Sequence, residues 1–326
     1  MAEPKSWTLP SKHRPKPELL AFDVEAALRS MVHLRTEIPE DAFTAGTLGT
    51  ERAGHGVVIQ GEARTVILTI GYLIAEAESI WITAHGSQVI PGHVLAYDYA
   101  SGFGLVQPLG SLAAPALPRA SAESLEIGDE LTVLGHGGLA HCLAVRLVAR
   151  HEFAGYWEYL LEDALYTAPV HPLWGGSALL NPAGALVGIG SLLVQQGEKA
   201  GQRDANLFVP IDGLEPILGE LLQHGGRLQP PRPWLGLYSS EDDERIVVAG
   251  LVAGGPAHRA GVSLGDVVIE VNGEPVNSLP AFYRAVWSQG AAGVRVRLTL
   301  LRAGEPLDIE VPTASREQFL RQPQRH

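Results

Sequence analysis

The chain has 326 residues, 46% of them apolar, which is enough for about two domains of roughly 100–200 residues each. Its 24 Lys and Arg against 36 Asp and Glu give a formal net charge of −12, which argues against a general binder of nucleic acid. The single Cys excludes an internal disulfide framework.

The first twenty residues, MAEPKSWTLPSKHRPKPELL, predict a flexible arm over residues 1–20. They contain several prolines and scattered basic residues, but no apolar run of the roughly 7–15 residues that a signal peptide requires. We therefore expect a cytoplasmic protein. Nowhere do about 18 apolar residues follow one another without a charge, Gly or Pro, so we expect no membrane-spanning helix.

Short apolar segments separated by turn residues dominate the next part of the chain. GVVI at 56–59 and TVILTI at 65–70, joined by QGEA, predict a β-hairpin. Helices are predicted over 21–33 and over 211–224, the second ending at Gly225. Further strands are predicted over 79–83, 88–98, 104–109, 130–135, 142–150, 177–180, 185–191 and 206–210. So many short strands favour an antiparallel barrel or a pair of packed sheets.

The segment GGRLQPPRPW, residues 225–234, has the Gly and Pro content of a linker and predicts a domain boundary near residue 230. The expected layout is a first domain over 21–225, a linker over 226–233, a second domain over 234–313 and a tail over 314–326.

The second domain has an ordered series of local signals. Pro256 and Gly261 predict the start and end of a short helix, and Asn272-Gly273 predicts a hairpin turn after the strand VVIEV at 267–271. An amphipathic helix over 278–289 and an alternating strand over 294–302 follow. This stretch, residues 232–312, resembles a PDZ domain of the permuted bacterial type found in HtrA/Deg proteases.

The resemblance to a PDZ domain implies peptide binding. Such domains accept an extended peptide as an added strand, and backbone N–H groups of a preceding loop hold its terminal carboxylate. The matching loop here is Trp234-Leu235-Gly236-Leu237, in which Gly236 allows close backbone approach. The helix that would form the other wall supplies three further candidates, each of which either faces the groove or belongs to the core: Phe282, Tyr283 and Val286.

The first domain resembles the trypsin-like protease domain of the same family. The segments that carry this resemblance are GHGVVI at 54–59, NPAGALVGIGS at 181–191 and NLFVPID at 206–212. The resemblance implies a mainly β protein, in which a trypsin-like double six-stranded antiparallel β-barrel precedes the permuted PDZ domain.

Acyl transfer by a serine protease needs a hydroxyl nucleophile, an imidazole base and a carboxylate that orients the imidazole. An ungapped match to the family places Tyr72 where the histidine belongs, Gly102 where the aspartate belongs and Gly175 where the serine belongs. A tyrosine with a pKa near 10 is a neutral phenol at pH 7 and a poor base. We therefore predict a catalytically degenerate pseudoprotease that is not an enzyme.

One alternative keeps the enzymatic activity. Ser177 lies two residues after Gly175 and becomes a displaced nucleophile if the register shifts, with His171 as a nearby base. A neighbouring subunit is a second source of missing groups. In either case the chain would be an active serine endopeptidase.

No metal or cofactor is expected. His136, His141 and Cys142 lie close together in sequence, but their spacing fits no usual zinc site. The expected partners are protein C-termini or extended segments, captured in a scaffold, adaptor or chaperone-like role. Because members of the family are commonly trimers that work in the bacterial periplasm, the resemblance implies a homo-oligomer and offers the periplasm as the alternative location.

Overall fold

The computed structural model describes residues 9–62, 64–196 and 202–321. They divide into two compact units. The first unit contains the described residues up to 151 and those from 163 to 227, and the second contains 152–162 and 228–321. Residues 1–8 of the predicted arm and 322–326 of the predicted tail lie outside the described residues.

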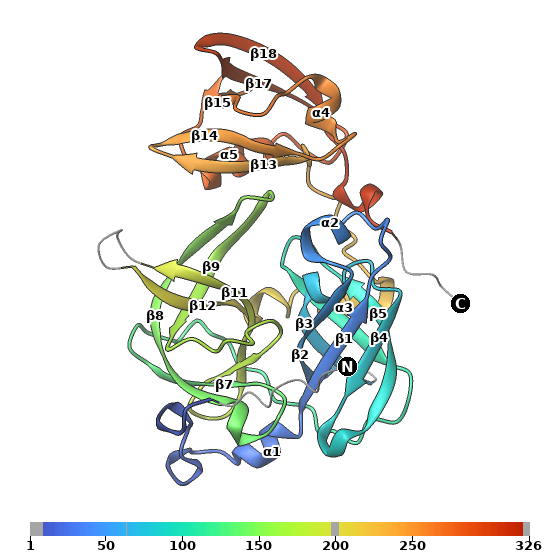
Figure 1. Ribbon diagram of the computed structural model, residues 1–326, viewed down its shortest axis with the longest axis vertical. Coiled ribbons are helices and arrows are strands. Elements are labelled where there is room, and N and C mark those ends of the chain that lie inside the picture. Colours follow the sequence, from blue (N-terminus) through green and yellow to red (C-terminus); the bar gives the residue numbers. More distant parts are fainter. Residues whose placement is uncertain (1–8, 63, 197–201, 322–326) are drawn as a thin grey trace. The chain divides into compact units, whose positions relative to one another are not determined.

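The first barrel of the first unit closes in the strand order β1-β2-β3-β6-β5-β4 (Figure 1). Its strands are β1 (Met31–Glu37), β2 (Glu51–Gln60), β3 (Thr65–Ile70), β4 (Ser79–Thr83), β5 (Val89–Tyr97) and β6 (Phe103–Pro108). The predicted hairpin is present, because Val57 of β2 pairs with Leu68 of β3 in antiparallel register. β-branched and apolar side chains fill the barrel, since this shape of side chain packs well on a pleated surface.

The second barrel closes in the order β10-β11-β12-β9-β8-β7. Its strands are β7 (Glu130–Leu134), β8 (Cys142–Gly155), β9 (Tyr159–Ala168), β10 (Ala178–Leu180), β11 (Leu186–Gln196) and β12 (Arg203–Pro210). A buried apolar cluster that includes Leu131, Val145, Leu165 and Phe208 forms its core.

Part of the predicted arm has defined structure. Leu9 is buried within the core of the second barrel, and its N–H donates to the carbonyl of Ala140. Two turns of 3-10 helix, Ser11–His13 and Pro17–Leu19, follow. Burial of the Leu9 side chain and the backbone bond to Ala140 thus attach this part of the arm to the second barrel.

The α-helices of the first unit are short: α1 (Val24–Leu28), α2 (Ala45–Leu48) and α3 (Leu218–His224). The helix predicted over 21–33 ends at Leu28, because Met31 already begins the inner strand β1. The expected end at Gly225 is confirmed, since this residue has φ +75° and its N–H donates to the carbonyl of Leu221.

The second unit is a sheet in the order β13-β14-β15-β17-β18, with β16 paired to β15. The strands are β13 (Leu237–Asp242), β14 (Arg245–Leu251), β15 (Val267–Val271), β16 (Glu274–Pro275), β17 (Arg295–Arg302) and β18 (Glu305–Pro312), and the helices are α4 (Pro256–Ala260) and α5 (Leu279–Trp287).

Local sequence explains where these elements begin and end. Pro256 opens α4 and Gly261 closes it in the left-handed conformation. Asn272 and Gly273 both have positive φ, as a tight hairpin turn requires. The Ser278 hydroxyl accepts from the Ala281 N–H and caps α5.

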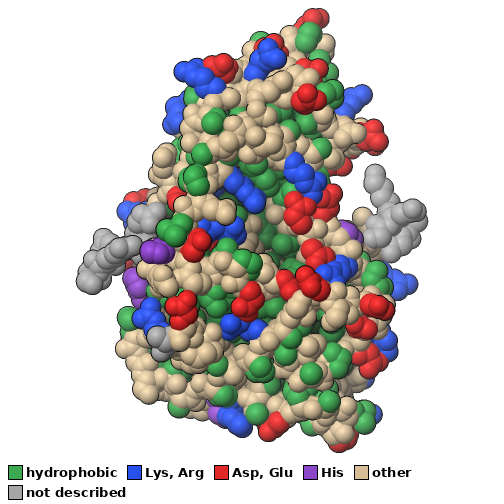
Figure 2. Space-filling view, turned by 180° about the vertical axis from the view of Figure 1, so that it is seen from behind, with side chains coloured by type: hydrophobic (Ala, Val, Ile, Leu, Met, Phe, Trp, Pro, Cys, Tyr) green, Lys and Arg blue, Asp and Glu red, His purple; other side chains and the backbone are tan. Residues whose placement is uncertain are grey.

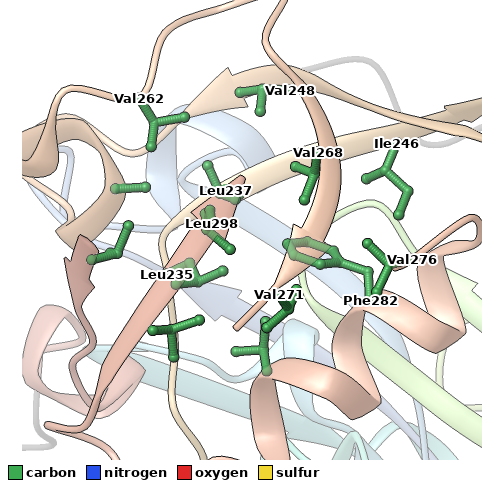
Figure 3. Close-up of a cluster of buried hydrophobic side chains, with 14 of the residues drawn as sticks. Leu235, Leu237, Ile246, Val248, Val262, Val268, Val271, Val276, Phe282 and Leu298 are labelled. Atoms are coloured by element: carbon green, nitrogen blue, oxygen red, sulfur yellow. The ribbon is translucent and has the colours of Figure 1, made fainter. Parts of the chain in front are cut away.

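The core of the second unit lies between α5 and the sheet (Figure 3). Phe282 from the helix and Leu235, Leu237 and Val268 from the strands and the preceding loop are all buried there. Leu160 of β9 belongs to the same buried cluster, so the outer end of the β8–β9 hairpin is part of the packing of the second unit.

These observations confirm the predicted fold class, a trypsin-like double barrel followed by a PDZ domain. Figure 2 shows acidic and basic side chains interspersed over the face in view rather than gathered by sign. Over the part of the chain that the structure describes, no helix combines the length and apolar character that crossing a bilayer requires.

Candidate functional site

The loop Trp234–Leu237 lies directly before and at the start of β13. Leu235 and Leu237 point into the core, so the backbone between them is held in one conformation. Gly236 has φ +77°, and a Cβ at this position would lie 3.3 Å from the Trp234 ring and 3.4 Å from Pro256. The positive φ is the main reason for glycine here, and a Cβ would in addition be a tight fit.

Three consecutive backbone N–H groups of this loop converge on one carboxylate. Leu235 donates to Oε2 of Glu158 at 2.9 Å, and Gly236 and Leu237 donate to Oε1 at 2.7 and 2.9 Å. Such charge-assisted bonds are stronger than bonds between neutral groups. The loop therefore has the donor geometry that recognition of a carboxylate needs.

The Glu158 side chain is 3% exposed. Burial raises the pKa of Glu158 to about 7, and the three N–H donors and the positive charge of Arg316 only partly oppose this shift. Glu158 is not among the site residues predicted from the sequence. The only local signal is an acidic residue among aromatic ones in a turn, and such a signal is weak without the contact to the loop.

The neighbouring strand β13 offers a further backbone donor. The Ser239 N–H donates to the carbonyl of Tyr156 at 2.8 Å, two residues before Glu158 in the chain. A donor on a strand edge and a carboxylate-binding loop are the two elements of strand-addition recognition.

The three candidates on α5 are all buried. Phe282, Tyr283 and Val286 are each no more than 1% exposed and belong to the core cluster of the second unit. The Tyr283 hydroxyl also donates to the carbonyl of Gly155 at 2.7 Å, and burial raises the pKa of this phenol. Tyr283 therefore serves packing and the binding of the turn after β8 at the same time.

In the first unit, two of the positions matched to a catalytic triad lie side by side. Tyr72 is in the turn of 3-10 helix Gly71–Leu73 after β3, and its hydroxyl lies 2.8 Å from the point where a Cβ of Gly175 would be. The third position is close in the fold, since the Gly71 N–H donates to the carbonyl of Gly102 at 2.7 Å. The ungapped match thus brings together residues that are neighbours in space.

Tyr72 is held by a hydrogen bond from its hydroxyl to the carbonyl of Ser191 at 2.8 Å. Burial raises the pKa of Tyr72, and a hydrogen bond with Trp174 opposes this shift. A phenol with a raised pKa is neutral at pH 7 and acts as a hydrogen-bond donor.

The displaced candidate Ser177 is fully buried, and its hydroxyl donates to the carbonyl of Trp174 at 2.8 Å. His171 is also fully buried. Its Nδ1 accepts from the Leu173 N–H at 3.2 Å, and its Nε2 lies 3.1 Å from the carbonyl of His141. Backbone groups therefore engage both imidazole nitrogens as well as the serine hydroxyl.

A group of imidazoles near this region was missed by the sequence analysis. The rings of His33 and His136 lie 6.2 Å apart, those of His33 and His55 lie 6.4 Å apart, and those of His55 and His171 lie 6.1 Å apart. His33 and His55 face each other across β1 and β2, a pairing that depends on strand register and not on sequence proximity. Burial lowers the pKa of His55 well below its usual value, with His171 adding to the effect.

The structure also places the segment that contains His136, His141 and Cys142. Cys142 is buried at the start of β8, and burial raises the pKa of its thiol to about 12. Among the described residues, no group of three or more His, Cys, Asp or Glu side chains is arranged to hold a metal ion.

Two family descriptions match the chain: the trypsin-like peptidase domain over residues 54–189 and the PDZ domain over residues 233–313. The chain is 26% identical over 275 residues to the periplasmic pH-dependent serine endoprotease DegQ of Escherichia coli (strain K12), a match that covers 80% of this chain and 59% of DegQ. It is also 26% identical over 288 residues to the putative serine protease HhoA of Synechocystis, covering 80% of this chain and 70% of HhoA. The chain thus spans less than two thirds of DegQ.

Among solved structures, the HtrA-type protease AlgW with a decapeptide has a TM-score of 0.55 at 19% sequence identity, covering 92% of this chain and 99% of AlgW. At this identity the likeness establishes a shared fold.

These relatives correct two expectations. The prediction that the chain is not an enzyme is wrong by this comparison, because the similar proteins are named as serine proteases. An ungapped match tests three sequence positions, whereas activity depends on which groups meet in the folded chain, so the substitutions do not establish inactivity. The cytoplasmic location finds no support either, since DegQ is named as periplasmic.

The chain therefore combines a trypsin-like peptidase domain with a PDZ domain that follows it, and in sequence it is similar to serine proteases such as DegQ and HhoA.

Proposed function

We propose that the protein uses its PDZ domain to bind the carboxyl-terminal or extended segments of partner proteins. The observation that carries this proposal is the convergence of the N–H groups of Leu235, Gly236 and Leu237 on a single carboxylate. A terminal carboxylate presents the same two oxygens to such a loop. The solved structure of the related AlgW with a decapeptide supports peptide binding by this fold.

In this proposal, each candidate of the peptide site has a distinct task. The backbone of Trp234–Leu237 binds the carboxylate. The Ser239 N–H on the edge of β13 donates a hydrogen bond to a carbonyl of the peptide backbone. Phe282, Tyr283 and Val286 support the site from α5 through their packing. The proposed domain limits remain 21–225 and 234–313, with the linker 226–233 between them.

The test compares synthetic decapeptides of random sequence that end in a free carboxylate with the same pool ending in an amide. Both pools are passed over the immobilised full chain, and the retained peptides are measured by mass spectrometry. Because an amide cannot accept three charge-assisted bonds, we expect at least about tenfold more retention of the free-acid pool. Equal retention of the two pools would exclude carboxylate recognition by the loop.

Serine endopeptidase activity is a second candidate, favoured by the names of DegQ and HhoA. The nucleophile candidate is Ser177, whose hydroxyl must first leave its bond to the carbonyl of Trp174. A fluorophosphonate probe and an unfolded casein substrate test this activity. Labelling and cleavage that both disappear in Ser177→Ala would support it, and their absence in the wild-type chain would count against this residue.

We propose a periplasmic homo-oligomer, a trimer by resemblance to the family, that holds bound partners in a scaffold, adaptor or chaperone-like role. Sedimentation velocity of the purified chain tests the assembly, with a species near three times 34.8 kDa as the expected result. Fractionation of the host cells tests the location.

A further inference from the structure

The loop proposed for peptide binding is already occupied by a side chain of the same protein. All three N–H donors point to the carboxylate of Glu158, which belongs to the turn that joins β8 to β9. Because the donors of one loop cannot satisfy two carboxylates at once, any external carboxylate must replace this one.

The contact extends over four consecutive residues of the turn. The carbonyl of Gly155 accepts from the Tyr283 hydroxyl at 2.7 Å, and the carbonyl of Tyr156 accepts from the Ser239 N–H at 2.8 Å. The carbonyl of Trp157 accepts from Nη1 of Arg316 at 3.2 Å. Together with the bonds to the Glu158 carboxylate, these bonds fix the turn to the rest of the second unit.

The conformation of Glu158 fits this role. Its φ is +61°, in the left-handed region that a residue with a side chain rarely adopts. Residues held in this region occur where surrounding contacts determine the conformation. At Glu158 the surrounding contacts are the three bonds from the loop, which hold the buried carboxylate in place.

Aromatic contacts and ion pairs surround the turn. Tyr156 lies 4.9 Å from Trp157 and 6.0 Å from Tyr238, measured between ring centroids. Arg284 of α5 forms ion pairs with Glu152 and Glu162 on the two strands of the hairpin, and all three side chains are partly exposed. Exposed ion pairs of this kind contribute little to stability.

We infer that the turn Gly155–Glu158 is an internal ligand of the PDZ domain, and that peptides with a free terminal carboxylate bind by displacing Glu158 from the loop. This inference rests on the proposed function, because it assigns the ligand class and the regulation of the same site. It predicts that the wild-type protein binds such peptides more weakly than a protein whose turn has lost its carboxylate.

The first experiment measures peptide retention by full-length variants, with the same free-acid and amide pools. Glu158→Gln keeps the volume and removes the charge, and Glu158→Ala removes both. The matched control Glu244→Gln changes an exposed acidic residue of the same unit that lies in the turn between β13 and β14. We expect on the order of tenfold more free-acid peptide retained by both Glu158 variants, and no change for the control.

The second experiment measures amide hydrogen exchange in the same proteins without peptide. The amides of residues 235–237 should exchange at least about tenfold faster in Glu158→Gln and Glu158→Ala than in the wild type, while those of β17 keep their protection. β17 thereby controls for general loss of folding.

The outcomes are separable. Faster exchange together with increased peptide retention supports the inference. Unchanged exchange at 235–237 overturns the internal ligand, and the proposed function stands if free-acid peptides still bind. Faster exchange with no free-acid peptide retained by any protein overturns the proposed function, and with it the competition.

Discussion

The loop at 235–237 and the region around Gly175 are each filled by a side chain of the same chain, but with opposite chemistry. The loop receives the ionisable carboxylate of Glu158 through three backbone donors. Beside Gly175 stands the phenol of Tyr72, which is neutral at pH 7 and donates one hydrogen bond to the carbonyl of Ser191. Charge thus distinguishes the two contacts.

The two contacts should therefore differ in how easily they open. Water and other carboxylates compete with a buried carboxylate for its backbone donors, and a proton can neutralise its charge. The contact of Glu158 therefore responds to pH and to added carboxylates. A neutral phenol packed against glycine responds mainly to changes of volume.

The largest effect concerns pH and Glu158. Its pKa is raised to about 7 from 4.5, so the stability linked to this group is fully present below about pH 4.5 and is lost as the pH rises through about 7. The loss is on the order of 3 kcal/mol by linkage. Arg316, Tyr238 and Tyr283 are the other titratable groups that interact with this carboxylate.

Thermal unfolding of the wild type and Glu158→Gln between pH 4.5 and 7.5 checks this prediction. The lowered pKa values of the buried imidazoles, such as His55, act in the opposite direction, because neutral bases stabilise the fold as the pH rises. The difference between the two proteins removes their contribution. If the difference in stability between the wild type and Glu158→Gln did not vary with pH, the Glu158 contact would be no more sensitive to pH than the Tyr72 contact.

A smaller effect is expected from Gly175→Ala. The new Cβ would lie 2.8 Å from the Tyr72 hydroxyl, so the variant should lose about 1–3 kcal/mol of unfolding free energy. Removing the hydroxyl in Tyr72→Phe should relieve the clash, and the double variant should therefore be more stable than the sum of the single changes predicts. Strict additivity in urea unfolding would mean that the two residues do not touch.

Tyr72→Phe alone removes the bond to the Ser191 carbonyl and leaves an acceptor without this donor. We expect a loss of about 1 kcal/mol in the free energy of unfolding, measured in urea. Tyr156→Phe is the matched control, because Tyr156 is 57% exposed, and it should change stability by less than about 0.5 kcal/mol. A control that is as destabilised as Tyr72→Phe would contradict the assigned role.

The smallest effect is expected at Arg284. Its side chain is 46% exposed and forms ion pairs with Glu152 and Glu162. Arg284→Ala should cost less than about 1 kcal/mol and change the retention of free-acid peptides by less than about twofold. A change as large as that of Glu158→Ala would show that surface ion pairs, and not the buried carboxylate, hold the turn.

Sequence reasoning succeeded where the signal is local. Strands β3 and β4 have the limits that their apolar runs predicted, 65–70 and 79–83, because β-branched residues between turn residues leave few alternatives. The helix α5 and the turn at Asn272-Gly273 likewise follow from capping and turn residues.

It failed where distant contacts decide the outcome. Strand β1 was not predicted, because Met31–Glu37 directly follows a helical segment. Strand β9 was not predicted either, because Tyr159–Ala168 mixes acidic and apolar residues. Glu158 meets its donors 77 to 79 positions away in the chain, so no local pattern marks it. Its pairing depends on the folded second unit.

The most direct test of the account is an NMR titration of the Glu158 carboxyl carbon in the full-length protein, with and without a saturating free-acid peptide. Without peptide the pKa should be about 7, and with peptide it should fall toward the ordinary value of an exposed glutamate. An ordinary pKa in the absence of peptide, or a titration that the peptide leaves unchanged, would contradict the account.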